Sequence, residues 1–247
     1  MRVHGQPDET TTEWREVGTT DGPMKVYLAR PAVVHGAVVV LQEAFGVNEH
    51  IQDVARRIAA AGYLALAPDL FHRHENGLVD YADRETAMSR IAALGVEEIR
   101  TDVGAALAGL EAEGGLDGRT GVIGFCFGGR AAFTAATLFP ELAGTVVFYG
   151  PGIAEGPHAV LDRVDEIAGK MLMLVGDADP TIPAGHLRAI EEACGNAAAD
   201  LRIETFAGAG HAFHCDARPQ AYHAEAARGA WQETLEFLAE TVRGQGA

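Results

Sequence analysis

The chain has 247 residues, of which 48% are hydrophobic and 22% charged, and its 19 Lys and Arg against 35 Asp and Glu give a formal net charge of −16. These proportions are typical of an ordinary globular protein and argue against a disordered or low-complexity chain. The negative charge argues against a nucleic-acid partner and against docking on an anionic membrane, so an anionic small molecule would need a local positive site.

The sequence shows few signals for export, for membrane insertion or for zinc binding by cysteines. Residues 1–9 lack the apolar core of a signal peptide, and no run approaches the roughly 20 apolar residues of a membrane span. The three cysteines, Cys126, Cys194 and Cys215, show no Cys-x-x-Cys spacing typical of zinc binding. We therefore expect a cytoplasmic protein, a monomer or small homo-oligomer, that contains no resident metal and has no membrane partner.

Apolar, β-rich runs alternate with helical patterns along the chain. The predicted strands are 24–29, 36–42, 63–67, 120–125, 144–149, 170–175 and 201–206. Several are unbroken apolar runs, as expected for strands buried on both faces of a parallel sheet. The order predicts an α/β fold with a doubly wound, mostly parallel sheet and helices on both faces, forming one domain over residues 1–247.

Three helical regions bear on the site. Apolar residues at helical spacing between 51 and 58 predict an amphipathic helix that Gly62 ends. A last helix over about 224–242 carries apolar residues that we interpret as core. The least regular stretch, 71–95, contains a helix near 84–94 and is predicted to form a lid or wall over the cleft. Its His72-x-His74 pair is weak evidence for a metal site.

The turn that follows the strand 36–42 lies where an oxyanion hole belongs in such a sheet. The backbone N–H groups of Ala44 and Phe127 could together hold a developing negative charge on oxygen. Glu43 does not fit easily, because a carboxylate beside a thiolate raises the pKa of the thiol. Alternatively, Glu43 simply hydrogen-bonds the backbone of the turn.

Residues 124–128, Gly-Phe-Cys-Phe-Gly, follow a predicted strand and precede a helical segment, which is the arrangement of a nucleophile elbow. The glycines two positions before and after Cys126 remove side chains where the chain doubles back. The N-terminus of the next helix favours the thiolate form of Cys126. Alternatively, this is a Gly-rich turn around a buried, unreactive cysteine.

Ligands bind at the carboxyl ends of the strands in open α/β sheets, so catalytic groups are expected in the turns that follow strands. Asp177 and Asp179 follow one predicted strand, and His211 lies in a Gly-flanked turn after the next. The order Cys126, Asp179, His211 is that of nucleophile, acid and histidine in α/β-hydrolases. His211 would act as base and Asp179 would orient it. Each acid could instead be a polar cap, and His211 a hydrogen-bonded loop residue.

Together these segments resemble the dienelactone hydrolase family of α/β-hydrolases, and the resemblance spans nearly the whole chain. It rests on Gln42-Glu43-x-Phe45-Gly46-Val47-Asn48, Gly124-Phe125-Cys126-Phe127-Gly128-Gly129, Asp179-x-x-Ile182-Pro183 and Gly210-His211-x-Phe213. The resemblance implies an α/β-hydrolase fold and hydrolysis of a dienelactone, a carboxylate-bearing unsaturated lactone, to maleylacetate, with no metal or organic cofactor. It favours Asp179 over Asp177, and it implies that Glu43 keeps the resting thiol protonated until substrate binds.

The resemblance also implies two arginines that hold the substrate carboxylate. Arg84 matches the one in the lid helix. The second is expected four residues after the histidine, where this chain has Cys215, and Arg218 is the candidate to reach the same place. The cluster of His211, His214 and Cys215 could alternatively bind zinc, but the triad already requires His211.

The leading hypothesis is therefore a cysteine-nucleophile hydrolase of a small lactone or ester, with carboxymethylenebutenolidase-like activity. One alternative is a general carboxylesterase or thioesterase with a different pocket shape. Another is a non-catalytic, ligand-binding pseudo-hydrolase, because fold does not fix function. Dinucleotide binding is disfavoured, because residues 124–129 do not fit Gly-x-Gly-x-x-Gly.

Overall fold

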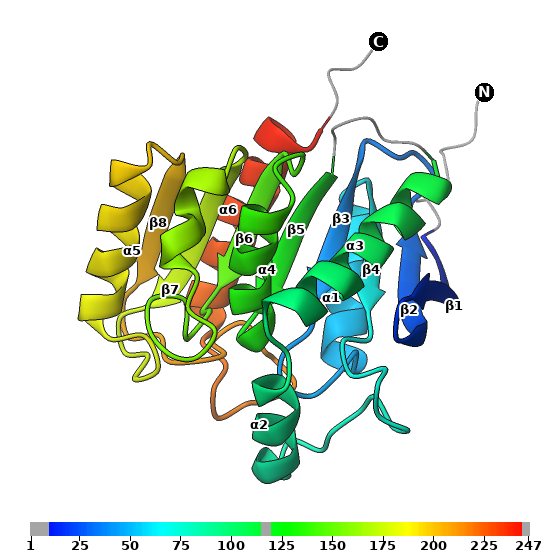
Figure 1. Ribbon diagram of the computed structural model, residues 1–247, viewed down its shortest axis with the longest axis horizontal. Coiled ribbons are helices and arrows are strands. Elements are labelled where there is room, and N and C mark those ends of the chain that lie inside the picture. The colour runs from blue at the N-terminus through cyan, green and yellow to red at the C-terminus, as the bar shows by residue number, and fades with distance from the viewer. Residues whose placement is uncertain (1–9, 115–119, 244–247) are drawn as a thin grey trace, which may run out of the picture.

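The computed structural model describes residues 10–114 and 120–243. Within them, eight strands form a sheet in the order β1-β2-β4-β3-β5-β6-β7-β8, with helices on both faces (Figure 1). The strands are β1 (Thr11–Thr19), β2 (Gly22–Arg30), β3 (Gly36–Leu41), β4 (Tyr63–Pro68), β5 (Thr120–Phe125), β6 (Gly144–Phe148), β7 (Lys170–Gly176) and β8 (Leu201–Phe206). The helices are α1 (Glu49–Ala60), α2 (Arg84–Ala92), α3 (Val96–Ala112), α4 (Phe127–Leu138), the 3-10 helix η1 (Leu161–Glu166), α5 (Ala184–Asn196) and α6 (Ala224–Thr241).

All seven predicted strands are present, and the mostly parallel sheet is confirmed. β4, β3 and β5 to β8 pair in parallel, whereas β2 is antiparallel to both β1 and β4. The strand β1 was not predicted, because it is polar and its first six residues are exposed. Its pairing with β2, together with an edge contact of 5.3 Å between the rings of Trp14 and Tyr27, holds it in place.

The core lies on both sides of the central strands. Every residue of β3, β4 and β6 is buried, as expected where helices cover both faces of a parallel sheet. In Figure 1, α3, α4 and α5 lie in front of the sheet and α6 behind it. Arg57 of α1 lies 4.1 Å from the Trp231 ring of α6, so α1 shares that rear face. The buried Ala227 and Leu238 confirm that α6 packs on the core.

The turn between β5 and α4 has the strained geometry of a nucleophile elbow. Cys126 has φ 56° and ψ −119°, a region that residues with a side chain rarely occupy. A Cβ on Gly124 would lie 1.8 Å from the carbonyl oxygen of Gly128, and one on Gly128 would lie 2.4 Å from that of Leu41. Both positions therefore require glycine, and α4 begins directly against the end of β3.

The segment 71–95 leaves the sheet layers, and α2 lies beyond them in Figure 1. Its first part is anchored by the fully buried Asp102, which accepts a hydrogen bond from Arg73 at 2.7 Å and lies 3.1 Å from His72 Nε2. His74 instead packs edge-on against Phe71, with the ring centres 6.5 Å apart. The two histidines thus have separate structural partners and do not form a metal pair.

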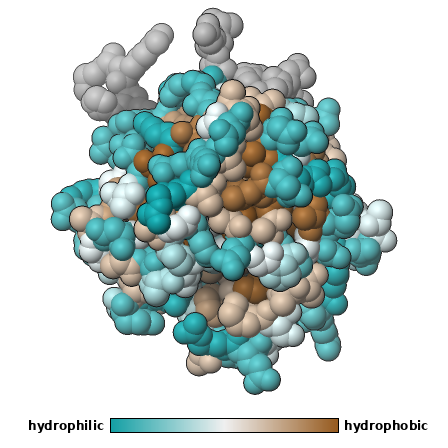
Figure 2. All heavy atoms as spheres, turned by 60° about the vertical axis from the view of Figure 1, so that its left-hand side comes forward, coloured by the Kyte–Doolittle hydropathy of each residue, from teal (hydrophilic) through white to brown (hydrophobic). Residues whose placement is uncertain are grey.

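Among the described residues, no helix is long and apolar enough to cross a membrane. The face that carries α5 and β8 is mostly hydrophilic, with apolar patches framed by polar side chains (Figure 2). Residues 1–9, on which the expectation about a signal peptide rests, lie outside the described residues.

The elbow predicts a steep penalty for any side chain at Gly124. Gly124→Ala should lower the free energy of unfolding by about 1–3 kcal/mol or more, because its Cβ would overlap backbone that cannot move aside. Gly195→Ala is the matched control, since nothing lies within 4 Å of a Cβ there and Ala favours helix over Gly by about 0.5–1 kcal/mol. Urea unfolding of both variants measures the difference. Equal stability of the two would contradict the contact.

Candidate active site

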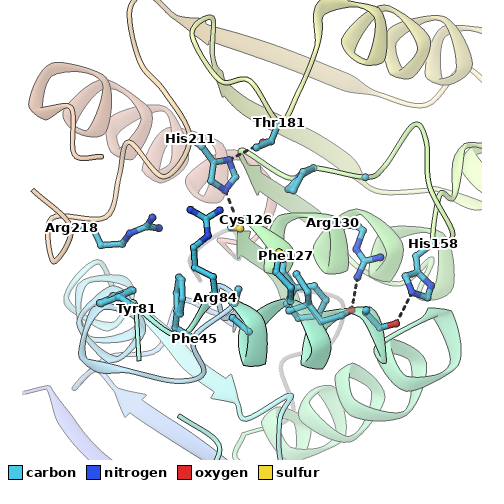
Figure 3. A pocket seen from close by; sticks show the side chains of 17 residues that line it. Phe45, Tyr81, Arg84, Cys126, Phe127, Arg130, His158, Thr181, His211 and Arg218 are labelled. Carbon is cyan, nitrogen blue, oxygen red and sulfur yellow. Dashed lines mark hydrogen bonds between the residues drawn. The ribbon is translucent and has the colours of Figure 1, made fainter. Parts of the chain in front are cut away.

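Three turns at the carboxyl edge of the sheet bring a thiol, an imidazole and a carboxylate into line. Cys126 Sγ lies 3.1 Å from His211 Nε2, and His211 Nδ1 lies 2.8 Å from Asp179 Oδ2. Figure 3 shows the first of these contacts at the centre of the pocket. The three residues come from the turns after β5, β7 and β8, so the fold brings together side chains that lie up to 85 positions apart in the chain.

The structure distinguishes the two acids of the turn after β7. Asp179 is buried and also accepts hydrogen bonds from the N–H and the hydroxyl of Thr181, at 2.8 and 2.7 Å. Asp177 is exposed and accepts the N–H of Gly208 at 2.7 Å. Asp179 is thus the acid that orients His211, whereas Asp177 stabilises a turn. Thr181 was not singled out from the sequence, although a Thr two residues after an Asp is a recognisable turn signal.

The Asp179 carboxylate and the His211 imidazolium each stabilise the charged form of the other. Burial raises the pKa of Asp179, but hydrogen bonds from His211 and Thr181 outweigh it and leave that pKa below its usual value. Burial likewise disfavours a charged His211, but its bonds to Asp179 and Cys126 raise the pKa of His211 to about 10. The site therefore favours an imidazolium beside the sulfur at neutral pH.

The other two cysteines lie in different surroundings. Burial raises the pKa of the Cys194 thiol to about 11. Burial, together with the nearby Glu43, raises the pKa of Cys215 to about 12. Since the thiolate is the reactive form, neither is suited to act as a nucleophile at neutral pH.

Two backbone N–H groups belong to residues that line the cavity near the sulfur. Ala44, in the turn after β3, and Phe127, the first residue of α4, both line the pocket that contains Cys126. Within the described residues, neither N–H has a hydrogen-bond acceptor in the protein. Unused donors at the N-terminus of a helix, next to a nucleophile, are what an oxyanion hole requires.

Glu43 is fully buried next to this turn. Its Oε1 accepts a long hydrogen bond of 3.5 Å from the hydroxyl of Tyr149. The Tyr149 ring also packs edge-on against His211, with the ring centres 5.3 Å apart, and its own backbone has φ 38°. Strained backbone commonly marks functional sites. Tyr149 was predicted only as the end of a strand, and nothing in the sequence pattern pointed to this position.

The pocket itself is a cavity of about 450 Å³. Its walls come from the turn after β3, from α2 and from the start of α4, and include Phe45, Tyr81, Ala87, Met88, Ile91 and Phe127. Most of these side chains are apolar, whereas Arg84 and Arg218 supply positive charge from two different segments (Figure 3). The lining therefore suits a small molecule with an apolar body and an anionic group.

The two expected arginines do reach the same cavity. Arg84 lies at the start of α2, and Arg218 lies 5.5 Å from the Phe45 ring and 5.6 Å from the Tyr81 ring. Within the part of the chain that the structure describes, neither guanidinium pairs with a carboxylate. Cys215, which occupies the second arginine position, is instead buried, 3.7 Å from the Tyr81 hydroxyl.

A third arginine in the pocket was missed by the sequence reasoning. Arg130 of α4 donates to the carbonyl oxygens of Ile91 and Leu94 at 3.3 Å each, and so holds the end of α2. His158 lies 3.0 Å from the carbonyl oxygen of Ala92 at the same helix end. These contacts fix α2 over the cavity. A lone Arg after the elbow carries no sequence signal for such a bond, because its partner carbonyls are 36 and 39 residues away.

The sheet order, the elbow and the sequence of nucleophile, acid and histidine define an α/β-hydrolase fold. The family model described as "Dienelactone hydrolase family" matches residues 24–242. The chain therefore belongs to the dienelactone hydrolase family and is a hydrolase that acts on ester bonds.

Individual relatives agree with this assignment. A "Putative carboxymethylenebutenolidase" of Yersinia pestis is 35% identical over 248 aligned residues, covering 97% of this chain and 91% of the relative. A "Probable 2-oxo-3-(5-oxofuran-2-ylidene)propanoate lactonase" of Bradyrhizobium sp is 33% identical, covering 92% and 93%. The crystal structure of a "Putative Dienelactone Hydrolase" from Klebsiella pneumoniae superposes with a TM-score of 0.85 at 30% identity, covering 94% of this chain and 100% of that one.

The raised pKa of His211 can be measured directly by NMR of ¹⁵N-labelled histidine. Its imidazole should stay protonated from pH 7 to 9 and lose its proton only near pH 10. Because this pKa lies above the ordinary value of 6.5, the interaction of protonated His211 with Asp179 stabilises the fold fully below pH 6.5. This stabilisation is lost as the pH rises through about 10.

Removing the oriented acid should shift that titration. Asp179→Asn should lower the pKa of His211, because it removes the carboxylate whose hydrogen bond raises that pKa most. Asp177→Asn should leave the pKa of His211 unchanged, because the Asp177 carboxylate bonds the N–H of Gly208 instead. The opposite ranking would assign the orienting role to Asp177.

Proposed function

We propose that this protein hydrolyses a small, carboxylate-bearing lactone through a covalent intermediate on Cys126. The observation that carries the proposal is the continuous chain from Cys126 Sγ to His211 at 3.1 Å and from His211 to Asp179 at 2.8 Å. It opens into a cavity that two arginines share with the sulfur. A nucleophile, a base and an orienting acid in contact are the parts that acyl transfer needs.

In the first half-reaction, once substrate has bound, the Cys126 thiol gives its proton to the buried carboxylate of Glu43, and the resulting thiolate sulfur attacks the ester carbonyl carbon. The carbonyl oxygen becomes an oxyanion that the N–H groups of Ala44 and Phe127 stabilise, a term worth about 3–4 kcal/mol of barrier per donor. The imidazolium of His211 then gives its proton to the leaving oxygen, the ring C–O bond breaks, and an acyl-thioester remains. Asp179 keeps His211 in the required tautomer and orientation.

In the second half-reaction water replaces the leaving oxygen. His211, now neutral, takes a proton from water, and the resulting hydroxide attacks the thioester carbonyl in the same oxyanion site. Collapse of this intermediate breaks the C–S bond and releases the second carboxyl group of the product, which loses its proton to water. The thiolate that leaves takes back the proton held by Glu43. For a lactone, the alcohol and the acid leave as one open-chain molecule, so a single cavity serves both steps.

Glu43 has a proposed role in the resting state, in which its carboxylate keeps the Cys126 thiol protonated. Its carboxylate is buried, and within the described residues no cation pairs with it. A carboxylate so placed disfavours a nearby thiolate. The family resemblance assigns it this role, so that the nucleophile becomes reactive only when substrate binds.

The substrate class follows from the walls of the cavity. Arg84 and Arg218 line it and lack carboxylate partners among the described residues, so an anionic substrate can be bound despite the net charge of −16. The Bradyrhizobium relative is named as a probable lactonase for an unsaturated furanone that carries a propanoate, which supports the same class. A general esterase is the second candidate, because most of the lining is apolar.

The proposal is tested first at the nucleophile. Cys126→Ala should lower turnover of a lactone or activated ester by about four orders of magnitude or more, because no acyl-thioester can form. With the native chain, mass spectrometry of a rapidly quenched reaction with an activated ester should show the acyl group on the peptide that contains Cys126.

Cys194→Ala is the matched control, since Cys194 is buried in α5 and has no place in the chemistry. It should retain most of the turnover and the same acyl adduct. Full turnover by Cys126→Ala, or an adduct on another residue, would reject the mechanism.

Arg84 should govern the choice of substrate. Arg84→Ala should lower kcat/KM for a carboxylate-bearing lactone by about ten- to a hundredfold, as expected for a lost charge-assisted bond of about 1.5–3 kcal/mol. A neutral ester should be almost unaffected. Arg100→Ala controls for the loss of one positive charge, because Arg100 lies on α3 and faces Glu97 at 3.5 Å. Equal losses for both substrates would make Arg84 structural, and no loss for either would favour the general esterase.

A further inference from the structure

A second group of chemically active side chains lies buried beside the active site. Glu43, His50 and Cys215 come from the turn after β3, from the beginning of α1 and from the segment after His211. Atoms of these three residues that could bind a metal all lie within 4.8 Å of one another. Their exposed fractions are 0%, 3% and 0%. Neither His50 nor Cys215 takes part in the ester chemistry.

Two polar atoms of this group are unsatisfied. Oε2 of Glu43 and Nε2 of His50 are buried, and within the described part of the chain they have no hydrogen-bond partner. Buried polar atoms in native proteins are almost always paired with protein groups, with water or with an ion. The only hydrogen bond to Glu43 found among those residues is the 3.5 Å contact from Tyr149. The group is therefore incomplete as it stands.

The surroundings of His50 and Cys215 resemble those of metal ligands. His50 Nδ1 lies 3.6 Å from the Oδ1 of Asp216, a half-exposed carboxylate next to Cys215 in the chain. A metal-bound histidine usually has a carboxylate or carbonyl at its other ring nitrogen, which fixes the tautomer and orientation of the ring. The Tyr81 hydroxyl lies 3.7 Å from Cys215 Sγ and can orient the sulfur.

The donor set has a clear preference among ions. A thiolate, an imidazole and a carboxylate are zinc ligands, whereas Mg²⁺ and Ca²⁺ prefer oxygen donors alone. Two anionic ligands would balance the charge of Zn²⁺ and leave the buried site neutral. Zinc–ligand bonds of about 2.0–2.3 Å in a tetrahedron place the donor atoms about 3.3–3.8 Å apart. The donor atoms, now up to 4.8 Å apart, would therefore move about 1 Å closer together on binding.

We propose that Glu43, His50 and Cys215 bind one Zn²⁺ ion, with water in the remaining position. The site differs from the His211, His214 and Cys215 cluster that the sequence suggested, because His211 contacts Cys126 and the His214 ring packs between Phe125 and Trp231, with ring centres 5.4 and 5.6 Å away. Zinc is not needed for the ester chemistry. In the zinc-free protein Glu43 keeps its proposed role toward the resting thiol, and bound zinc would withdraw its carboxylate from that role.

The test uses metal binding, not activity, as its readout. All proteins carry Cys126→Ser, so that the nucleophile cannot ligate, and are freed of metal with a chelator. Zinc binding is measured by competition with a chromophoric zinc indicator. Binding of Co²⁺ is followed by absorption, because a cysteine thiolate on Co²⁺ gives a charge-transfer band in the near ultraviolet. We expect one equivalent of zinc, this band with Co²⁺, and no competition from Mg²⁺ or Ca²⁺.

Matched variants locate the site. Cys215→Ser and His50→Gln should each weaken zinc binding by at least about tenfold, and Cys215→Ser should abolish the charge-transfer band. Cys194→Ser, a change at another buried cysteine, should alter neither. Thermal melting gives a second readout: zinc should raise the Tm of the Cys194→Ser protein but not that of the Cys215→Ser protein, and the melts show that both variants fold.

Absence of stoichiometric zinc binding would overturn the proposal, as would a charge-transfer band that survives Cys215→Ser. Neither outcome touches the proposed hydrolase mechanism, because catalysis is tested separately at Cys126. Conversely, if the protein binds zinc through Cys215 but forms no acyl-thioester, the zinc site would be supported and the proposed function rejected.

Discussion

The close contact between the end of β3 and the start of α4 is the constraint on which the active site depends. Glycine at 124 and 128 lets backbone touch backbone, since a Cβ at either position would lie within 2.4 Å of a carbonyl oxygen. The contact holds Cys126 in its strained conformation and keeps the turn that carries Ala44 beside the first N–H of α4. Cys126 and the two candidate oxyanion donors are thus positioned by one backbone contact rather than by separate interactions.

The proposed substrate is an anion, and the distribution of charge bears on how this acidic protein would bind it. The chain carries a net charge of −16, yet the cavity contains three arginines of different character. Arg130 is held by backbone carbonyls at the end of α2 and serves the lid segment. Arg84 and Arg218 remain available to the cavity. Since the desolvated interior strengthens a charge-assisted bond, these two side chains can outweigh the repulsion of distant surface carboxylates.

The position of Cys215 links substrate recognition to the buried group behind it. Where the family pattern has an arginine, this chain has a buried thiol, and Arg218 supplies a positive charge to the cavity from three residues further on. Among the described residues Glu43 has no cationic partner, and the sulfur of Cys215 lies within 4.8 Å of its carboxylate. Under the proposed function, recognition of the anion would therefore fall to Arg84 and Arg218, whereas Cys215 contributes to the surroundings of Glu43.

The sequence by itself determined seven of the eight strands in the described residues, the elbow and the chemical types of the candidate triad. These depend on local signals: apolar runs, a Gly-x-Cys-x-Gly turn, and polar residues directly after strands. It missed β1, whose polar residues are held only by pairing with β2. Tertiary structure decided which acid meets His211, that Arg218 reaches the cavity, that Arg130 and Tyr149 join the site, and that Glu43, His50 and Cys215 converge. Those outcomes rest on contacts between residues far apart in the chain, and the physical reason is that side-chain direction and packing across layers leave no periodic trace in a single sequence.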